Sequence, residues 1–292
     1  MDRIPVLLDT DIGSDIDDAM ALAYLLRQKR CELVGITTVT GDVQQRAALA
    51  EVVCHAAGRK NIPIHCGRRD VLVSGPGQPN VPQYAAIHNL PHRMDRPENS
   101  AVEYLRKTIR ARPGEITLLS IGPFGNIALL FALDPEIPFL LKSFVSMAGV
   151  FFAGDHGEWN AVCDPTATSI VAHTPRKSHL WVGLDVTTKC TLEAQEVRKR
   201  FVGEPLRTVS TLAETWFMGT KTATFHDPLA AALIFHPELC EYESGQVKAP
   251  LVGAGGEKAG FTTIEPGPGP DQVAKIVSVE GFFDEFFSVT AA

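Results

Sequence analysis

The sequence predicts one α/β domain over residues 1–292: an open, mostly parallel Rossmann-like sheet with helices on both faces and a C-terminal β extension. Up to about residue 235, short β-rich runs alternate with helical patterns, which is typical of a parallel sheet covered by helices. From Cys240 the pattern changes to strands joined as hairpins. The chain shows no internal repeat and no linker long enough to separate two domains.

The first half begins with an apolar run that ends in a cluster of acids. Apolar runs bounded by turn residues predict the strands, and helical periodicity predicts the helices. In chain order we expect strand 6–8, helix 17–26, strand 33–39, helix 44–57, strand 63–66, helix 101–110 and strand 116–121. A stretch rich in Pro and Gly begins at Gly75, and Gly122 and Pro123 make the turn into helix 126–132.

The second half continues the alternation and closes on an aromatic helix. We expect strand 144–147, an irregular segment to Asn160, helix 165–173, strand 180–184, helices 193–200 and 228–235, and strands 246–252, 261–264 and 272–279. The glycine-rich residues 253–258 lack the arrangement of a phosphate loop and are expected to form a hairpin turn. The aromatic side chains of the last helix are expected in the core or at a subunit contact: Phe282, Phe283, Phe286 and Phe287.

The charge balance argues against a nucleic-acid partner. The chain has 27 Lys and Arg against 34 Asp and Glu, a formal charge of −7, whereas nucleic-acid binding draws on clustered basic residues. The densest basic stretch, 106–112, has helical spacing and is expected to be a solvated helix face. No apolar run reaches the roughly 18–20 residues of a membrane span. Because the N-terminus shows no signal-peptide pattern and the six cysteines are scattered, we expect a cytoplasmic protein.

Residues 9–18 read Asp-Thr-Asp-Ile-Gly-Ser-Asp-Ile-Asp-Asp, with no Lys or Arg between Arg3 and Arg27. Two carboxylates about 4 Å apart repel by roughly 4 kcal/mol at an effective dielectric constant near 20, so this turn needs protons, water or a cation. Helix capping accounts for two or three of the acids. It does not account for Asp9 and Asp11, which end a strand where open α/β sheets bind ligands. The all-oxygen donor set favours calcium or magnesium over zinc.

Two hydrolase families begin in a related way. Phosphohydrolases of the haloacid dehalogenase type have a strand ending in Asp-x-Asp-x-Thr/Val, but here Gly13 stands at the fifth position. From Asp9 to Leu22 the sequence more closely resembles the signature of the nucleoside hydrolase (inosine–uridine-preferring) family, Asp-Thr-Asp-x-Gly-x-Asp-x-Asp-Asp-Ala-x-Ala-Leu. Many members of that family lack two residues of this stretch.

Four further motifs of that family follow in order. Residues 37–42 resemble its Thr-Thr-Val-x-Gly-Asn, with Asp42 in place of Asn. Residues 120–126, 157–165 and 225–228 resemble its Thr-Gly-Pro-Leu-Thr-Asn, Ala-Glu-Phe-Asn…Asp-Pro and His-Asp-Pro motifs. The resemblance covers about residues 4–235. It implies the nucleoside hydrolase fold and hydrolysis of the N-glycosidic bond of ribonucleosides to base and ribose.

The resemblance also implies a set of site residues. Calcium would be held by Asp11, Asp18, the backbone carbonyl of Ile121 and Asp227, and would lower the pKa of a bound water. Asp11 would be the general base, and Asp9 would support the ligands by hydrogen bonding. The ribose hydroxyls would be held by Asp17, Asp42, Glu158 and Asn160, with Asp15 a rival to Asp17.

Recognition of the base is less well determined. His226 would protonate the leaving base, since an unperturbed histidine pKa near 6.5 lies in the working range. A histidine at this position is typical of the inosine–uridine type, whereas Trp159 resembles the purine-specific members. His88 would contact the base, although Asn89 replaces the family's Gly after it. The short segment before Glu158 offers only Asp155 or His156 for the 5′-hydroxyl.

Two other classes of function remain open at this stage. One is a magnesium-dependent phosphohydrolase with Asp9 as nucleophile, and the other is a non-catalytic nucleoside-binding protein. The expected partner is in each case a small molecule. The resemblance alone implies a homodimer or homotetramer.

Overall fold

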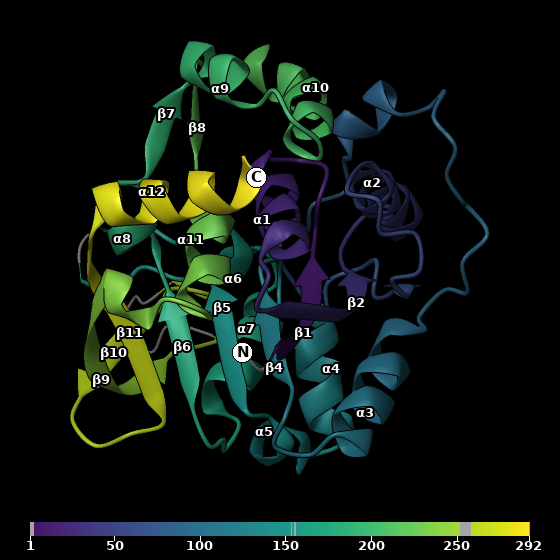
Figure 1. The fold of residues 1–292 in the computed structure, drawn as a ribbon. Coiled ribbons are helices and arrows are strands. Elements are labelled where there is room, and N and C mark those ends of the chain that lie inside the picture. Colours follow the sequence, from purple (N-terminus) through teal and green to yellow (C-terminus); the bar gives the residue numbers. More distant parts are fainter. Residues whose placement is uncertain (1–2, 153, 155, 252–257, 292) are drawn as a thin grey trace.

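The computed structural model describes residues 3–152, 154, 156–251 and 258–291. Its centre is a nine-stranded sheet in the order β10-β9-β11-β6-β5-β4-β1-β2-β3 (Figure 1). In chain order the strands are β1 Ile4–Thr10, β2 Cys31–Thr38, β3 Ile64–Cys66, β4 Thr117–Ser120, β5 Ser143–Met147, β6 His179–Val182, β9 Cys240–Lys248, β10 Thr263–Pro266 and β11 Asp271–Val277. Strand β9 pairs antiparallel with β10 and β11, and the other neighbouring pairs are parallel.

The C-terminal strands extend this same sheet, because β11 pairs in parallel with β6. Strand β9 begins at Cys240, earlier than the sequence pattern predicts, and ends at Lys248. The turn expected at 253–258 lies largely outside the described residues. The mostly parallel α/β fold predicted from the sequence is therefore confirmed, with its β extension joined to the main sheet.

Helices cover both faces of the sheet, and β1 shows why. Val6 and Leu8 pack into one hydrophobic cluster and Leu7 into the other, since successive side chains of a strand point to opposite faces. On the first face lie α1 Asp17–Arg27, α2 Val43–Ala56, α11 His226–Leu233 and α12 Val279–Thr290. On the second lie α3 Ala101–Ala111, α4 Gly125–Leu133, α5 Ile137–Leu140 and α7 Pro165–His173 (Figure 1).

The aromatic residues of α12 pack mainly in the first cluster. Phe282 and Phe286 are fully buried, and Phe286 stacks on Tyr24 of α1 with ring centroids 6.0 Å apart. The expectation of a core role holds for these two side chains, and a subunit contact is not needed to bury them.

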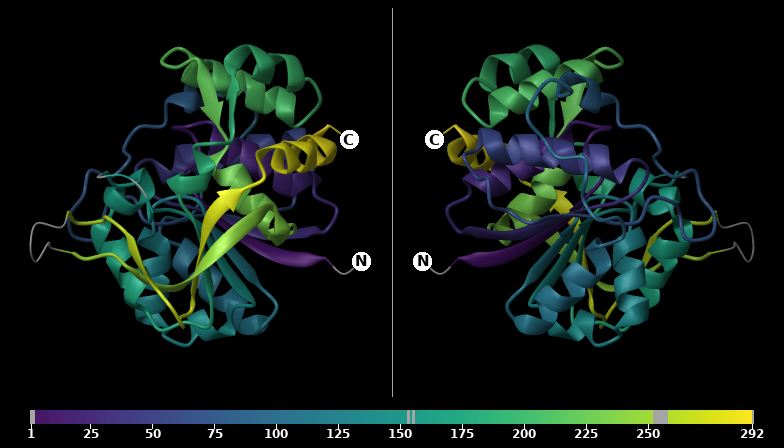
Figure 2. Two further views of the ribbon diagram at one scale, coloured as in Figure 1. Left: turned by 90° about the vertical axis from the view of Figure 1, so that its left-hand side faces the viewer. Right: turned by 90° about the vertical axis from the view of Figure 1, so that its right-hand side faces the viewer.

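A small cap stands apart from the main sheet. It consists of residues 191–224, with the antiparallel pair β7 Thr191–Glu193 and β8 Thr222–Thr224 and the helices α9 Ala194–Arg200 and α10 Leu206–Phe217. Figures 1 and 2 show the cap on one side of the molecule, above α1 and α12. The sequence analysis missed α10, although one side of this helix is buried through Leu206, Val209 and Leu212.

The basic stretch at 106–112 belongs to α3 and its end, as expected, and its charges are paired with acids. Arg106 pairs with Glu103, Arg110 with Asp134, and Arg112 with Glu32. None of the helices described is long and apolar enough to cross a bilayer.

Candidate active site

A cavity of about 830 Å³ opens beside the carboxyl ends of β1 and β4. From β1 the chain continues to β2 and β3 on one side, while β4 lies on the other, so this is the topological switch point where open α/β sheets bind ligands. Asp11 and Asp15 line the cavity from the loop after β1, Asp17 from the start of α1, and Ile121 from the end of β4. The sheet thus brings the acidic motif to the expected binding edge.

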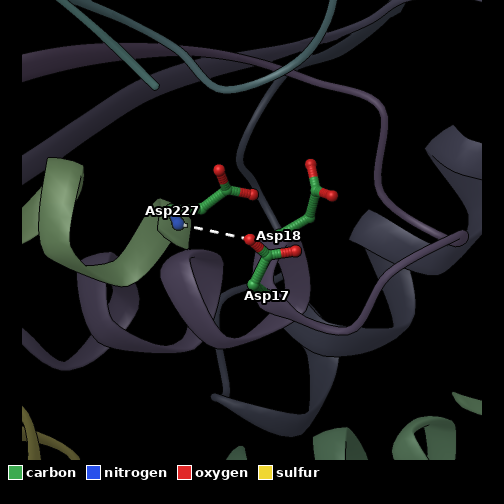
Figure 3. Close-up of side chains that lie close together, drawn as sticks. All are labelled: Asp17, Asp18 and Asp227. Atoms are coloured by element: carbon green, nitrogen blue, oxygen red, sulfur yellow. Dashed lines mark hydrogen bonds between the residues drawn. The ribbon is translucent and has the colours of Figure 1, made fainter. Parts of the chain in front are cut away.

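Three acids from distant segments meet at this cavity. One carboxylate oxygen each of Asp17, Asp18 and Asp227 lies within 4.8 Å of the others (Figure 3). The backbone amide of Asp227 donates to Asp17 Oδ2 at 3.3 Å, and the Thr10 hydroxyl donates to Asp18 Oδ1. Helices α1 and α11 both begin at this cluster. The partial positive charge of helix N-termini favours negatively charged carboxylates at these positions.

Burial makes this cluster electrostatically unfavourable on its own. It raises the pKa of Asp17, Asp18 and Asp227 well above the ordinary value, and mutual repulsion among the acids raises it further. Burial also raises the pKa of Asp15 to about 7. A divalent cation would remove this repulsion, and a set of carboxylate oxygens suits a hard cation such as calcium.

Asp11 and Asp9 end the first strand in different settings. Asp11 lines the cavity; burial raises the pKa of its carboxyl, and the Arg46 guanidinium opposes this rise. Asp9 is fully buried, and its Oδ1 accepts hydrogen bonds from Thr37 at 2.5 Å and Asn126 at 2.7 Å. Its Oδ2 has no hydrogen-bond partner among the described residues, and burial raises the pKa of Asp9 to about 7.

The opposite wall carries Glu158 and Asn160, both buried and both lining the cavity. Glu158 caps the short helix α6, Trp159–Cys163, by accepting from the amides of Asn160 and Ala161, and it also accepts from Gly149. Burial raises the pKa of Glu158 to about 7 despite these bonds. Asn160 Nδ2 donates to the carbonyl of Ile121 at 2.9 Å, which ties this wall to the end of β4.

His226 lines the cavity beside Asp227. Its Nδ1 lies 2.7 Å from the hydroxyl of Thr187, the last residue of α8, Leu184–Thr187. Burial lowers the pKa of His226 to about 4. The ring is therefore neutral at pH 7, and Thr187 holds its Nδ1.

Two expected substrate ligands lie elsewhere. Asp42 caps α2, accepting from the amides of Gln44 and Gln45 at 3.1 Å each. His88 is exposed, and its Nδ1 lies 2.8 Å from the carbonyl of Ala85. Neither residue is among those that line the cavity. Asp155 lies outside the described residues, and the exposed His156 is not among the lining residues either.

Several lining residues escaped the sequence analysis. Gln78, Asn80 and Pro82 belong to the stretch rich in Pro and Gly, which carries no secondary-structure periodicity. Thr215 and Trp216 come from α10, at the edge of the cap. The amphipathic pattern of residues 206–217 was the available signal for the second group.

Comparison with known proteins identifies this arrangement. Residues 6–284 match the family model described as inosine-uridine preferring nucleoside hydrolase. The chain belongs to this family. The match covers both the acidic motif and the His226-Asp227 pair, and it confirms the family predicted from the motifs. It also supports ribonucleoside hydrolysis over the phosphohydrolase alternative.

Individual nucleoside hydrolases agree with this assignment. The chain is 28% identical over 269 residues to uridine nucleosidase 1 of Arabidopsis thaliana, covering 85% of this chain and 79% of the relative. It is 30% identical over 258 residues to the pyrimidine-specific ribonucleoside hydrolase RihA of Citrobacter koseri, covering 81% and 80%. A solved plant nucleoside hydrolase superposes with a TM-score of 0.85 at 22% identity, covering 99% of each chain, which supports the fold.

Proposed function

We propose that this nucleoside hydrolase cleaves ribonucleosides with the help of calcium held by Asp11, Asp18, the Ile121 carbonyl and Asp227. The observation that carries the proposal is the meeting of buried carboxylates from two segments, Asp17 and Asp18 on α1 and Asp227 on α11, beside one cavity. Buried carboxylates are rarely tolerated without a partner. A bound calcium ion would be such a partner and would lower the pKa of a water.

The donor set fits such an ion. Asp11, Ile121 and Asp227 all line the cavity, and Asp18 lies against Asp227 behind it. Asp17 is closer to this group than the sequence suggested, because its carboxylate shares the cluster with Asp18 and Asp227. Asp17 would therefore hold a ribose hydroxyl close to the metal ligands, and the less buried Asp15 is the rival for this role.

On the chain's own side, Asp11 takes the proton from the attacking water. Burial raises the pKa of this carboxyl, and a bound cation would act in the opposite direction and keep it ionised, as a general base must be. Glu158 and Asn160 hold ribose hydroxyls from the opposite wall. Negative charge close to the sugar stabilises the oxocarbenium-like transition state, in which positive charge develops at C1′.

His226 donates a proton to the departing base. Because Thr187 occupies Nδ1, the other ring nitrogen is left to meet the base. A pKa lowered to about 4 makes the imidazolium a strong acid but leaves little of it at neutral pH. We therefore expect His226 to increase the rate most for nucleosides whose base is a poor leaving group unless it is protonated.

The phosphohydrolase alternative requires an accessible nucleophile at Asp9. Here Asp9 is fully buried, engaged by Thr37 and Asn126, and absent from the cavity lining. Asp9 instead joins the end of β1 to Thr37 of β2 and Asn126 of α4, whereas the resemblance implies that it supports the metal ligands by hydrogen bonding.

The decisive experiment is a reducing-sugar assay across purine and pyrimidine ribonucleosides, with and without a chelator. We expect release of ribose that is lost with the chelator and restored by calcium. Saturable nucleoside binding without turnover would instead favour a binding protein. Restoration by magnesium but not by calcium would refute only the choice of calcium as the ion and would leave metal-dependent hydrolysis standing.

The compartment and the oligomeric state complete the proposal. All six cysteines are free and buried, which fits a reducing compartment such as the cytoplasm. We also propose a homodimer or homotetramer, which light scattering on the purified protein would test.

A further inference from the structure

Arg46 of α2 is the fully buried cation beside the acidic motif. Its side chain has no exposed surface, and its charge acts on both Asp11 and Asp18. Yet none of its described hydrogen bonds or ion pairs reaches a carboxylate. This is unusual, because buried charges are ordinarily paired directly.

The guanidinium instead gathers oxygen atoms from three loops. Nη1 donates to the carbonyls of Asp11 and Ile12, the latter at 3.1 Å, and to the Ser14 hydroxyl at 3.2 Å. Nη2 donates to the carbonyl of Gln78 at 2.8 Å, and Nε to the carbonyl of Thr40 at 2.7 Å. Three of these five acceptor residues, Asp11, Ser14 and Gln78, line the cavity.

The loops held by Arg46 are also strained or tightly packed. Thr40 has φ +60°, a left-handed conformation that a β-branched residue rarely adopts and that often marks functional sites. Gly41 has φ +63°, and a Cβ there would lie 2.2 Å from the carbonyl oxygen of Gln78. The Thr40 hydroxyl accepts from the amide of Gln78 at 3.1 Å. Strain of this kind persists only where surrounding contacts determine the backbone.

We propose that Arg46 is a positioning residue, which clamps the loops after β1, β2 and Gly77 together and so fixes Asp11 for metal binding and catalysis. The inference rests on the proposed function. It places a positive charge beside the acidic motif that is held by backbone carbonyls and a hydroxyl, so Arg46 itself occupies none of the carboxylates. The planar fork with five N–H donors is the feature that permits this, and lysine lacks it.

The chain contains a matched control. Arg176 is buried too and donates to the carbonyls of Val171, Ala172 and Thr174. Unlike Arg46, it also pairs directly with a buried carboxylate, Asp271, at 2.5 Å. Arg176 is not among the residues lining the cavity. An R176K variant therefore perturbs an arginine of similar burial without touching the proposed metal site.

The test compares R46K, R176K and the unmodified protein by calorimetric titration with calcium in the absence of nucleoside, after circular dichroism has shown that each is folded. We expect R46K to bind calcium at least tenfold more weakly and R176K to bind it within twofold of the unmodified protein. At saturating calcium, R46K should also lose turnover more than it raises KM, because Asp11 is displaced.

Three results would overturn the inference. Calcium affinity in R46K within twofold of the unmodified protein refutes the role of Arg46 and leaves the proposed function standing. Equal weakening in R176K shows a general loss of stability. Absence of calcium binding to the unmodified protein refutes both proposals. If R46K does not fold, S14A removes one acceptor of the same clamp, and an unchanged calcium affinity in that variant counts against the inference.

Discussion

Asp11 and His226 line the same cavity but carry opposite electrostatic perturbations. Burial raises the pKa of Asp11 and lowers that of His226 to about 4. The carboxylate is thereby made more basic and the imidazolium more acidic. This is the direction that a base and an acid require when they act at the two ends of one reaction.

Replacing Asp11 by Asn keeps the shape of the side chain and removes the base. Because general base catalysis contributes roughly 10²–10⁴-fold, we expect kcat/KM to fall about 10³-fold in the reducing-sugar assay. The melting temperature in the presence of a chelator should not fall, since a buried charge is removed. Full activity in this variant would refute the assignment of Asp11.

Replacing His226 by Ala separates leaving-group protonation from the rest of the reaction. For natural ribonucleosides we expect a loss of about 10²-fold in kcat/KM. For nitrophenyl riboside, whose leaving group needs no proton, we expect a loss of roughly threefold or less. Steady-state rates on both substrates decide the matter, and equal losses would show that His226 acts only through the packing of its ring.

The sequence predicted where several acids of the site lie, whereas their roles stay predictions. Strand-end acids on a parallel sheet necessarily reach one edge, so the placement of Asp11 and of Asp17 could be foreseen. From the sequence, Asp42 as the cap of α2 could not be distinguished from Asp42 as a sugar ligand, because either role needs a carboxylate after a strand. The burial of Arg46 could not be predicted, because an arginine in a helix is ordinarily expected to be exposed.

Most of the longer helices and strands could be predicted from the pattern, although the 12-residue helix α10 was not. Helix α7 lies where periodicity placed it, at Pro165–His173, and the alternation of strands and helices holds through β6. The five residues of α6 and the four of α8 are too short to show a period. The start of α6 depends on the cap that Glu158 forms with the amides of Asn160 and Ala161.

The start of α2 provides a test at the level of one helix. An Asp42→Ala variant loses two hydrogen bonds to backbone amides, which should lower the free energy of unfolding by about 1 kcal/mol. Asp42→Ser retains a capping hydroxyl and should recover most of that loss. Urea denaturation measures both. A rise in KM for ribonucleosides in the two variants alike would instead place Asp42 on the ribose.

Across the whole molecule, the folded state carries several carboxylates whose pKa is raised. A raised pKa contributes stability that is fully present below the unfolded value, near 4, and is lost as pH rises through the folded value. The folded pKa is about 7 for Asp9, Asp15 and Glu158, and burial and mutual repulsion also raise the pKa of Asp17, Asp18 and Asp227 well above the ordinary value. His226 acts in the opposite sense, but only between about pH 4 and its unfolded value near 6.5.

Between pH 6.5 and 8 the acids therefore dominate. We expect the melting temperature of chelator-treated protein to fall over this range. Added calcium should raise the melting temperature more at pH 8 than at pH 6.5, because the ion competes with protons for the same oxygens. Differential scanning fluorimetry with and without calcium measures both trends. A calcium effect independent of pH would contradict the buried cluster as the binding site.

The cavity is shared between the main sheet with its covering helices and the cap. Its acidic floor comes from the sheet and from α1 and α11, whereas Thr215, Trp216 and Thr220 come from the cap. Under the proposed function the sugar binds at the acids, so we expect the base to lie toward that rim, where substitutions leave the acids in place. Selectivity among bases can therefore drift during evolution, or be redesigned, without rebuilding the machinery that breaks the bond.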